Sequence, residues 1–177
     1  IVGHSAGAFI GRYFAKKYPE KVMGLFLIDP YQEMGKEEMG EWPTSFKLMN
    51  WSLRNLPWTG LPYFMLPNPP HPTYKTTKAI KTFGEEVYSE DISLEQFAKL
   101  DSVGSDMPIY LLTADKPNNQ YNELQKKWHK KILDKYSNDT NKHIIIESGH
   151  HIHFEHPEKV VEEIDNFLRD ISPMRKH

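Results

Sequence analysis

The hydrophobic positions of this chain fall first into short continuous runs. Apolar runs occupy residues 22–28, 108–114 and 143–147, and the first is followed directly by Asp29-Pro30. Short runs without polar alternation are typical of strands that are covered on both faces in a parallel sheet. These runs predict three buried strands, and Ile1-Val2 is expected to be the end of a fourth. We therefore expect a sheet of about four strands with one unpaired edge.

Between the predicted strands, apolar residues recur at helical spacing. A helix that starts after residue 5 is predicted to end near Tyr18, because Pro19 disfavours helical geometry in the residue before it. A second helix is predicted with one apolar face formed by Tyr121, Leu124, Trp128, Ile132 and Tyr136. A last helix opens at Pro157, and its apolar positions are Val160, Val161, Ile164, Phe167, Leu168 and Ile171. Strands alternating with helices indicate the α/β class with a parallel sheet.

The stretch 31–106 differs in composition from both of its flanks. It holds seven of the 13 prolines and three of the four tryptophans, and short helices are predicted at 43–54, 74–88 and 93–100. Linkers are poor in aromatic residues, so this stretch is predicted to be an inserted, mostly helical segment. The core would then consist of 1–30 and 107–177.

Composition excludes several classes of function. The chain has 177 residues, a formal net charge of −2 and a pI of about 6.5, which gives no electrostatic footprint for nucleic acid. It has no cysteine, which excludes disulfides, a thiolate zinc site and a cysteine nucleophile. Its apolar runs fall short of the ~20 residues that span a membrane. The compartment is left open, with the cytoplasm as the default and an upstream signal or anchor still possible.

Ser5 carries the sharpest chemical signal, in the segment Gly-His-Ser-Ala-Gly at 3–7. A serine hydroxyl is a poor nucleophile unless it is exposed, paired with a base and supplied with oxyanion stabilisation. A strand-to-helix turn provides the exposure if its neighbours are small, and we expect Gly3 and Gly7 to remove side chains that would collide. The backbone N–H of Ala6 is the candidate oxyanion donor. The alternative is a tight glycine turn in which the serine only caps the helix.

His150 is the candidate general base, because it follows a predicted strand and so lies at the carboxyl edge of the sheet, as Ser5 does. His151 is the next candidate. The third catalytic residue, an acid that orients the histidine, is predicted to be Asp115 because of its place in the chain order and at a strand end. Asp29 is the alternative acid.

Four histidines follow one another closely near the C-terminus, and they raise the alternative of a metal site. They are His150, His151, His153 and His156. No helical i, i+4 pair and no carboxylate pattern organises them as ligands, so we predict no metal. They are interpreted as surface and packing histidines around one catalytic histidine.

With the segment 3–7, Leu27-Ile28-Asp29-Pro30, Thr113-Ala114-Asp115 and Ser148-Gly149-His150 in place, the sequence resembles the α/β-hydrolase superfamily. The resemblance covers 1–30 and 107–172, and the middle fits the position of the family's variable lid. Family members carry several strands and a second oxyanion donor before the nucleophile. The resemblance therefore implies the C-terminal part of an α/β-hydrolase parallel sheet, with flanking helices, a mostly helical lid insertion and a missing N-terminal portion.

The resemblance further implies a serine hydrolase that cleaves a carboxylic ester or a related acyl bond through an acyl-enzyme, while peptidase, thioesterase and carbon–carbon hydrolase activities stay open. Ser5 would attack, His150 would relay the proton and Asp115 would orient His150. The expected partner is a small molecule with an apolar acyl group, and no cofactor is implied. The weakly indicated pocket residues are His4, Trp42, Trp51 and Trp58. The alternatives are a non-catalytic binding protein of the same fold and, less favoured, a metal-dependent enzyme using the histidines of 150–156.

Overall fold

The computed structural model describes all residues except 32–43, 61–75, 99–105, 118, 120–121 and 173–177. The chain divides into two compact units, one formed by Ile1–Gln32 with Leu100–His177 and the other by Glu33–Lys99.

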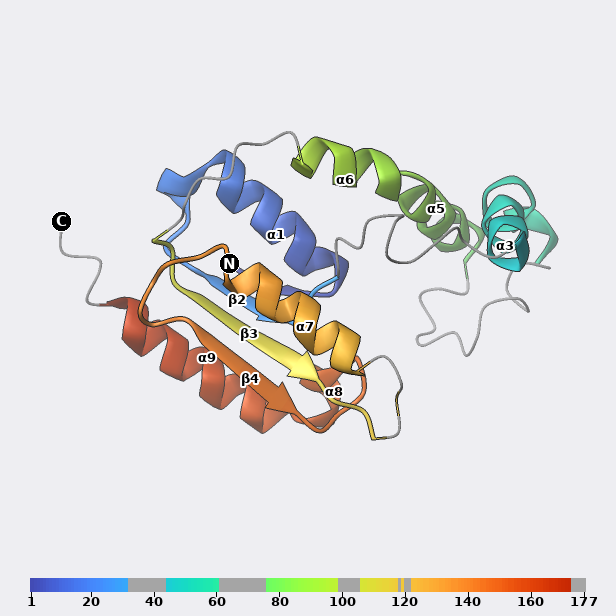
Figure 1. The fold of residues 1–177 in the computed structure, drawn as a ribbon. Helices are drawn as coiled ribbons and strands as arrows, with labels where there is room; N and C mark the ends of the chain where they lie inside the picture. The colour runs from blue at the N-terminus through green and yellow to red at the C-terminus, as the bar shows by residue number, and fades with distance from the viewer. Residues whose placement is uncertain (32–43, 61–75, 99–105, 118, 120–121, 173–177) are drawn as a thin grey trace. The chain divides into compact units, whose positions relative to one another are not determined.

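The first unit is built on a parallel sheet of four strands in the order β1-β2-β3-β4 (Figure 1). The strands are β1 (Val2–His4), β2 (Leu25–Ile28), β3 (Ile109–Ala114) and β4 (Lys142–Ile146). Each neighbouring pair is parallel, so all four carboxyl ends lie at one edge of the sheet. The predicted parallel sheet of about four strands is confirmed for the described residues.

The two inner strands are buried along their whole length, as their continuous apolar runs predict. β4 differs, because it is the last strand of the described sheet and Ile145 remains 51% exposed. The expectation that 143–147 is covered on both faces is therefore wrong. Alternation of faces, rather than composition, determines that Ile144 and Ile146 are half-buried while Ile145 is exposed.

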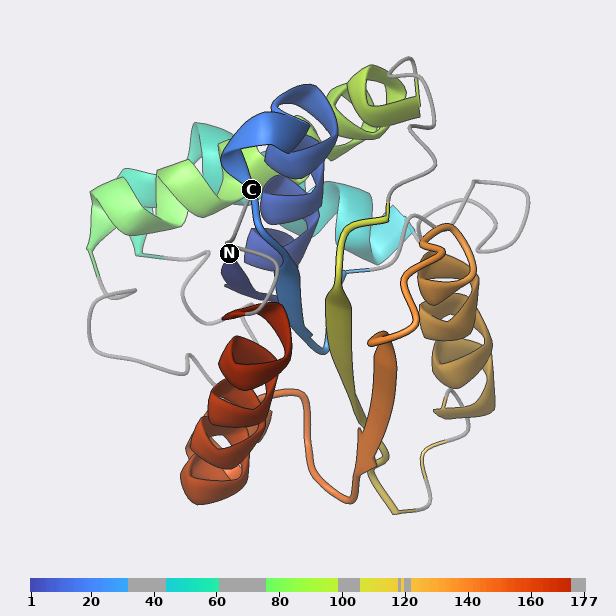
Figure 2. The ribbon, with the colours of Figure 1, turned by 90° about the vertical axis from the view of Figure 1, so that its left-hand side faces the viewer.

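Helices cover both faces of the sheet. On one face, α1 (Ala6–Lys17) and α7 (Asn122–Leu133) pack against a core that includes Ala8, Leu25, Leu111 and Ile132. On the other face, the short helix α8 (Ile152–Glu155) and α9 (Pro157–Ile171) pack with their own core (Figure 2). That core is formed by Phe26, Ile28, Tyr110, Leu112, Ala114, Ile152, Val160, Phe167 and Ile171. The predicted α/β class with flanking helices is confirmed.

Two helix boundaries follow the proline signals. α1 ends at Lys17, one residue before Tyr18, and Pro19 opens the short 3₁₀ helix η1 (Pro19–Lys21). α9 begins at Pro157, as predicted. Proline lacks an N–H and fixes φ, so it is favoured in the first turn of a helix and disfavours helical geometry just before it.

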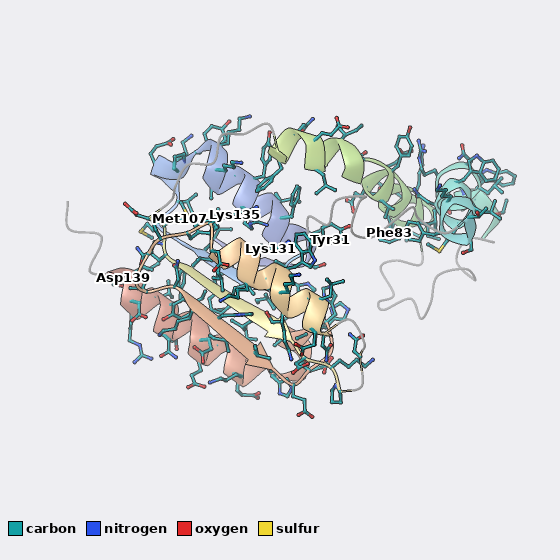
Figure 3. The ribbon with its side chains drawn as sticks, viewed as in Figure 1. Tyr31, Phe83, Met107, Lys131, Lys135 and Asp139 are labelled. Atoms are coloured by element: carbon teal, nitrogen blue, oxygen red, sulfur yellow. The ribbon has the colours of Figure 1, made fainter. Side chains whose placement is uncertain are left out.

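The buried face of α7 matches the predicted apolar face only in part. Ile132 is buried as predicted, but Leu124 is exposed, and Tyr121 lies outside the described residues. Asn122 and His129 are buried instead, and Gln125 is half-buried. Lys131, labelled on α7 in Figure 3, has its Nζ 3.9 Å from the ring centroid of Trp128. The helix therefore turns a line of polar residues toward the sheet, which is costly unless each finds a hydrogen-bond partner.

The described residues of the second unit lie mostly in helices. It contains α3 (Thr44–Asn55), the 3₁₀ helix η2 (Pro57–Thr59), α5 (Thr77–Tyr88) and α6 (Glu90–Ala98). Leu53 and Ile80 are buried where α3 meets α5, and a Cβ on Gly84 would lie 2.8 Å from the Cγ of Arg54. Gly84 therefore permits the close approach of these two helices.

Among the residues that the structure describes, no helix has the length and apolar character needed to cross a membrane.

Candidate active site

Candidate residues follow each strand at the carboxyl edge of the sheet. Ser5 follows β1, Asp29 follows β2 and Asp115 follows β3, while His150 lies in the loop after β4. His4 Nε2 lies 2.9 Å from the carbonyl oxygen of His150, so the loop after β4 reaches back to the end of β1. The expectation that Ser5 and His150 share one edge therefore agrees with the structure.

Ser5 occupies a strained turn between β1 and α1. Its φ is 52° and its ψ is −123°, a region that non-glycine residues rarely adopt and that costs about 1–3 kcal/mol. The turn is held on both sides: the N–H of Ser5 donates to the carbonyl of Ile28, and the N–H of Tyr31 donates to the carbonyl of Ser5, each at 3.0 Å. Within the described residues the Ser5 side chain makes no helix-capping hydrogen bond, so the alternative of a merely capping serine does not fit.

The two glycines that flank Ser5 behave differently. A Cβ on Gly3 would lie 2.7 Å from the Cα of Ala8 and 2.8 Å from its N, so glycine is required where β1 meets α1. A Cβ on Gly7 would meet nothing within 4 Å, so the expectation that Gly7 prevents a collision is wrong. Gly7 lies in the first turn of α1, on its exposed side.

Ala6 is the first residue of α1 and is exposed. The first N–H groups of a helix have no partner within it, and the helix dipole favours negative charge at that end. The Ala6 N–H next to Ser5 is therefore suited to receive an oxyanion.

His150 pairs with Asp29. Nδ1 of His150 lies 2.6 Å from Oδ2 of Asp29, and the Asp29 side chain is only 1% exposed while that of His150 is 48% exposed. Nδ1 donates to the carboxylate, which leaves Nε2 as the basic nitrogen of the imidazole.

Other groups hold the Asp29 carboxylate in place. Its Oδ1 accepts from the backbone N–H of Ala114 at 3.0 Å and from Nε2 of Gln125 at 2.6 Å. The backbone of Asp29 also has a positive φ of 42°, and its N–H donates to the carbonyl of Leu112. This turn directs the carboxylate across the end of β3 toward His150.

Asp115 does not contact His150, which corrects the preference for Asp115 as the partner of the histidine. Its Oδ2 instead accepts from Nζ of Lys126 at 2.9 Å, and its Oδ1 accepts from the amide of Asn122. Both partners belong to α7, so the side chain of Asp115 is directed to that helix. The alternative acid, Asp29, holds the position next to His150.

A buried chain of hydrogen bonds supports the turn at Asp29. His129 Nε2 lies 3.0 Å from the carbonyl of Pro30, and His129 Nδ1 lies 2.7 Å from Oγ1 of Thr113. A carbonyl only accepts, so Nε2 carries the proton and Nδ1 accepts from the Thr113 hydroxyl. That hydroxyl then accepts from His143 Nε2 at 2.7 Å. Burial lowers the pKa of His129 to about 4, so the imidazole is neutral, as this chain requires.

Glu155 anchors the loop that carries His150. Its Oε2 accepts from the N–H of Gly149 at 2.9 Å and from Oγ of Ser148 at 3.1 Å. A Cβ on Gly149 would lie 2.6 Å from Oε1 of Glu155, so a larger residue there would require the Glu155 carboxylate to shift. The hydrogen bond from the Gly149 N–H lowers the pKa of the Glu155 carboxyl, which keeps it ionised.

Three histidines can hold a metal ion: His4, His151 and His153 each offer a ring nitrogen, and these atoms lie within 4.8 Å of one another. Burial and neighbouring imidazoles lower the pKa of His4 and of His153. The grouping differs from the one that the sequence offered as an alternative, since His150 is bound to Asp29 and His156 Nε2 pairs with the carbonyl of Glu147. His4 comes from the opposite end of the chain, so the spacing of the histidines in 150–156 could not show that it joins the group.

The other candidate pocket residues belong to the second unit. Trp51 and Trp58 are both exposed, and Trp42 lies outside the described residues. A role for them in substrate binding stays a prediction.

Sequence reasoning did not identify Gln125, Thr113, His129 or His143 as part of the site. The signal available for three of them was a polar residue where an apolar one was expected. Gln125 and His129 lie on the buried face of α7, and Thr113 interrupts the apolar run of β3. Buried polar groups are hydrogen-bonded, so such interruptions point to a network.

No family model matches the chain, and no curated protein matches it. Among solved structures, it is similar to one described as a probable hydrolytic enzyme from Pseudomonas aeruginosa PAO1, with 17% identity and a TM-score of 0.53 over 94% of this chain and 62% of that one. It is also similar to a haloalkane dehalogenase from Agrobacterium tumefaciens C58, with 19% identity and a TM-score of 0.58 over 96% of this chain and 66% of that one. At such identities the likeness is one of fold. The chain spans less than two thirds of the length of either protein.

Proposed function

We propose that this chain, which has the α/β-hydrolase fold, is a serine hydrolase that cleaves a carboxylic ester or a related acyl bond through Ser5, His150 and Asp29. The observation that carries the proposal is the 2.6 Å contact between His150 Nδ1 and the buried Asp29 carboxylate, on the same sheet edge as the strained Ser5. The choice of Asp29 as the acid replaces that of Asp115.

Each residue of the proposed triad has a defined role. His150 Nε2 takes the proton of the Ser5 hydroxyl as Oγ attacks the substrate carbonyl. The Ala6 N–H stabilises the resulting oxyanion. The tetrahedral intermediate then collapses, the leaving group departs with the proton from His150, and an acyl-Ser5 ester remains.

Deacylation repeats these steps with water as the nucleophile. His150 Nε2 removes a proton from water, the hydroxide attacks the acyl-Ser5 carbonyl, and the Ser5 oxygen leaves with the proton. Asp29 fixes the imidazole tautomer and stabilises the imidazolium that forms in both halves of the reaction. In the described residues Ser5 and His150 share no hydrogen bond, and such contacts often tighten only in the substrate complex.

The proposed substrate is a small molecule with an apolar acyl group. The apolar character of the acyl group rests on the sequence prediction, in which His4, Trp42, Trp51 and Trp58 are weakly indicated pocket residues. Aromatic side chains of this size are common in ligand pockets. A peptidase, thioesterase or carbon–carbon hydrolase would use the same triad.

The test is hydrolysis of p-nitrophenyl acetate, butyrate and octanoate by the full-length chain, together with labelling by a fluorophosphonate probe. We expect turnover and a single labelled peptide that contains Ser5, both lost in Ser5→Ala. Ser172→Ala serves as the matched control, because Ser172 is an exposed residue at the end of α9. A folded protein without labelling would favour the non-catalytic alternative, and turnover that survives in Ser5→Ala would exclude Ser5 as the nucleophile.

A further inference from the structure

The histidine cluster next to the proposed triad has a geometry that the proposed reaction does not use. His4 is the last residue of β1, His151 precedes α8 and His153 lies within α8. Their ring centroids are 4.5 Å apart for His4 and His153, 5.4 Å for His4 and His151, and 6.0 Å for His151 and His153. We propose that these three side chains form a binding site for one Zn²⁺ ion.

The hydrogen bond of His4 prepares it as a ligand. Its Nε2 lies 2.9 Å from the carbonyl oxygen of His150, and a carbonyl only accepts, so Nε2 carries the proton. The lone pair is therefore on Nδ1. Histidines that bind metals commonly donate their other ring N–H to a backbone carbonyl, which fixes the tautomer and the ring orientation.

His153 provides the second indication. Its Nδ1 is buried and has no hydrogen-bond partner among the described residues. A buried nitrogen without a partner is unfavourable, and coordination to a cation would remove that cost. His151 is exposed, so its ring is free to turn toward an ion from the solvent side.

The ligand set favours zinc. Three imidazoles with an open fourth position match the tetrahedral coordination of Zn²⁺, at Zn–N distances of about 2.0–2.1 Å. Ligand nitrogens around such an ion lie about 3.3 Å apart. One ring nitrogen of each histidine lies within 4.8 Å of one from each of the other two, so side-chain rotation has to bring these nitrogens closer by up to about 1.5 Å.

The site is separate from the proposed triad but adjacent to it. The His150 ring centroid lies 4.6 Å from that of His4 and 5.3 Å from that of His151. The binding of zinc does not depend on the proposed function.

The binding test uses the full-length, metal-stripped protein and Zn²⁺ in isothermal titration calorimetry. We expect one ion per chain, with the affinity at least 10-fold lower in His151→Gln and in His153→Gln. His156→Gln is the matched control, because His156 follows α8 and its Nε2 already pairs with the carbonyl of Glu147. With Co²⁺ in place of Zn²⁺, the original protein and the control should show the visible absorption of a tetrahedral site. His153→Gln should not show it. Circular dichroism melts confirm that each variant is folded.

The proposal is overturned if zinc does not bind stoichiometrically, or if His156→Gln weakens binding as much as His151→Gln and His153→Gln do. A parallel assay of p-nitrophenyl butyrate hydrolysis separates the two proposals. Zinc binding by a protein without hydrolase activity would support the site and reject the proposed function. Hydrolase activity without zinc binding would support the proposed function and reject the zinc site.

Discussion

His150 Nδ1 and Asp29 Oδ2 lie 2.6 Å apart although 121 positions separate the two residues in the chain. The Asp29 side chain is almost completely buried, and that of His150 is about half exposed. A buried carboxylate beneath a half-exposed imidazole can stabilise the imidazolium while Nε2 remains open to solvent and substrate. This pair is the basis of the first prediction.

Replacing Asp29 with Asn is expected to lower kcat for ester hydrolysis by about 1,000- to 10,000-fold, because the amide can no longer fix the correct tautomer or stabilise the imidazolium. The matched control is Asp115→Asn, since Asp115 pairs with Lys126 instead of His150. Steady-state kinetics with p-nitrophenyl butyrate distinguish the two. Loss of activity in the Asp115 variant with retention in the Asp29 variant would restore Asp115 as the acid.

Gln125 is predicted to act as a positioning residue, because its amide donates to the Oδ1 of Asp29 at 2.6 Å. Gln125→Met removes this donor with little change in volume, and we expect kcat to fall by about 10-fold, equivalent to one hydrogen bond to a charged group, while KM changes little. Lys127→Met, at an exposed position of α7, is the control. An effect on KM alone, or on stability alone, would argue against a role through Asp29.

The buried His129 is expected to make stability depend on pH. Its pKa is about 4 in the folded protein and about 6.5 when unfolded, so the unfolded chain binds more protons between these values. The free energy of unfolding should therefore fall as the pH is lowered from about 6.5 toward 4, by about 3 kcal/mol from this residue. Urea titrations at several pH values measure how the free energy of unfolding depends on pH. This dependence should be weaker in His129→Gln but unchanged in His156→Gln. The same pH dependence in all three proteins would contradict the assignment to His129.

Replacement by alanine should affect the stability of the protein differently at Gly3 and at Gly7, the two glycines near Ser5. Gly3→Ala places a Cβ within 2.7 Å of the α1 backbone, so we expect destabilisation of about 3 kcal/mol or failure to fold. Gly7→Ala has open space and a helical position, so it should be neutral or stabilising by up to about 1 kcal/mol. Thermal or urea unfolding of the two variants provides the comparison, and a similar loss of stability in both would contradict the observed difference in packing.

Much of the fold follows from local sequence patterns. The parallel β2 and β3 follow from continuous apolar runs, and the boundaries at Pro19 and Pro157 follow from the stereochemistry of proline. Ser5 and His150 also emerge from local patterns, since each follows a predicted strand. These features depend on backbone geometry and on burial within one element, which a few neighbouring residues determine.

The tertiary structure decided which groups meet. Asp29 and Asp115 both follow a strand, and only the positive φ at Asp29 and its place between β1 and β3 direct its carboxylate to His150. The polar face of α7 and the approach of His4 to His151 and His153 likewise depend on segments distant in the chain. By itself, the sequence determined the elements and the candidate nucleophile and base. The choice of acid and the histidine cluster required the three-dimensional structure, because a hydrogen bond depends on distances of about 3 Å that sequence spacing does not encode.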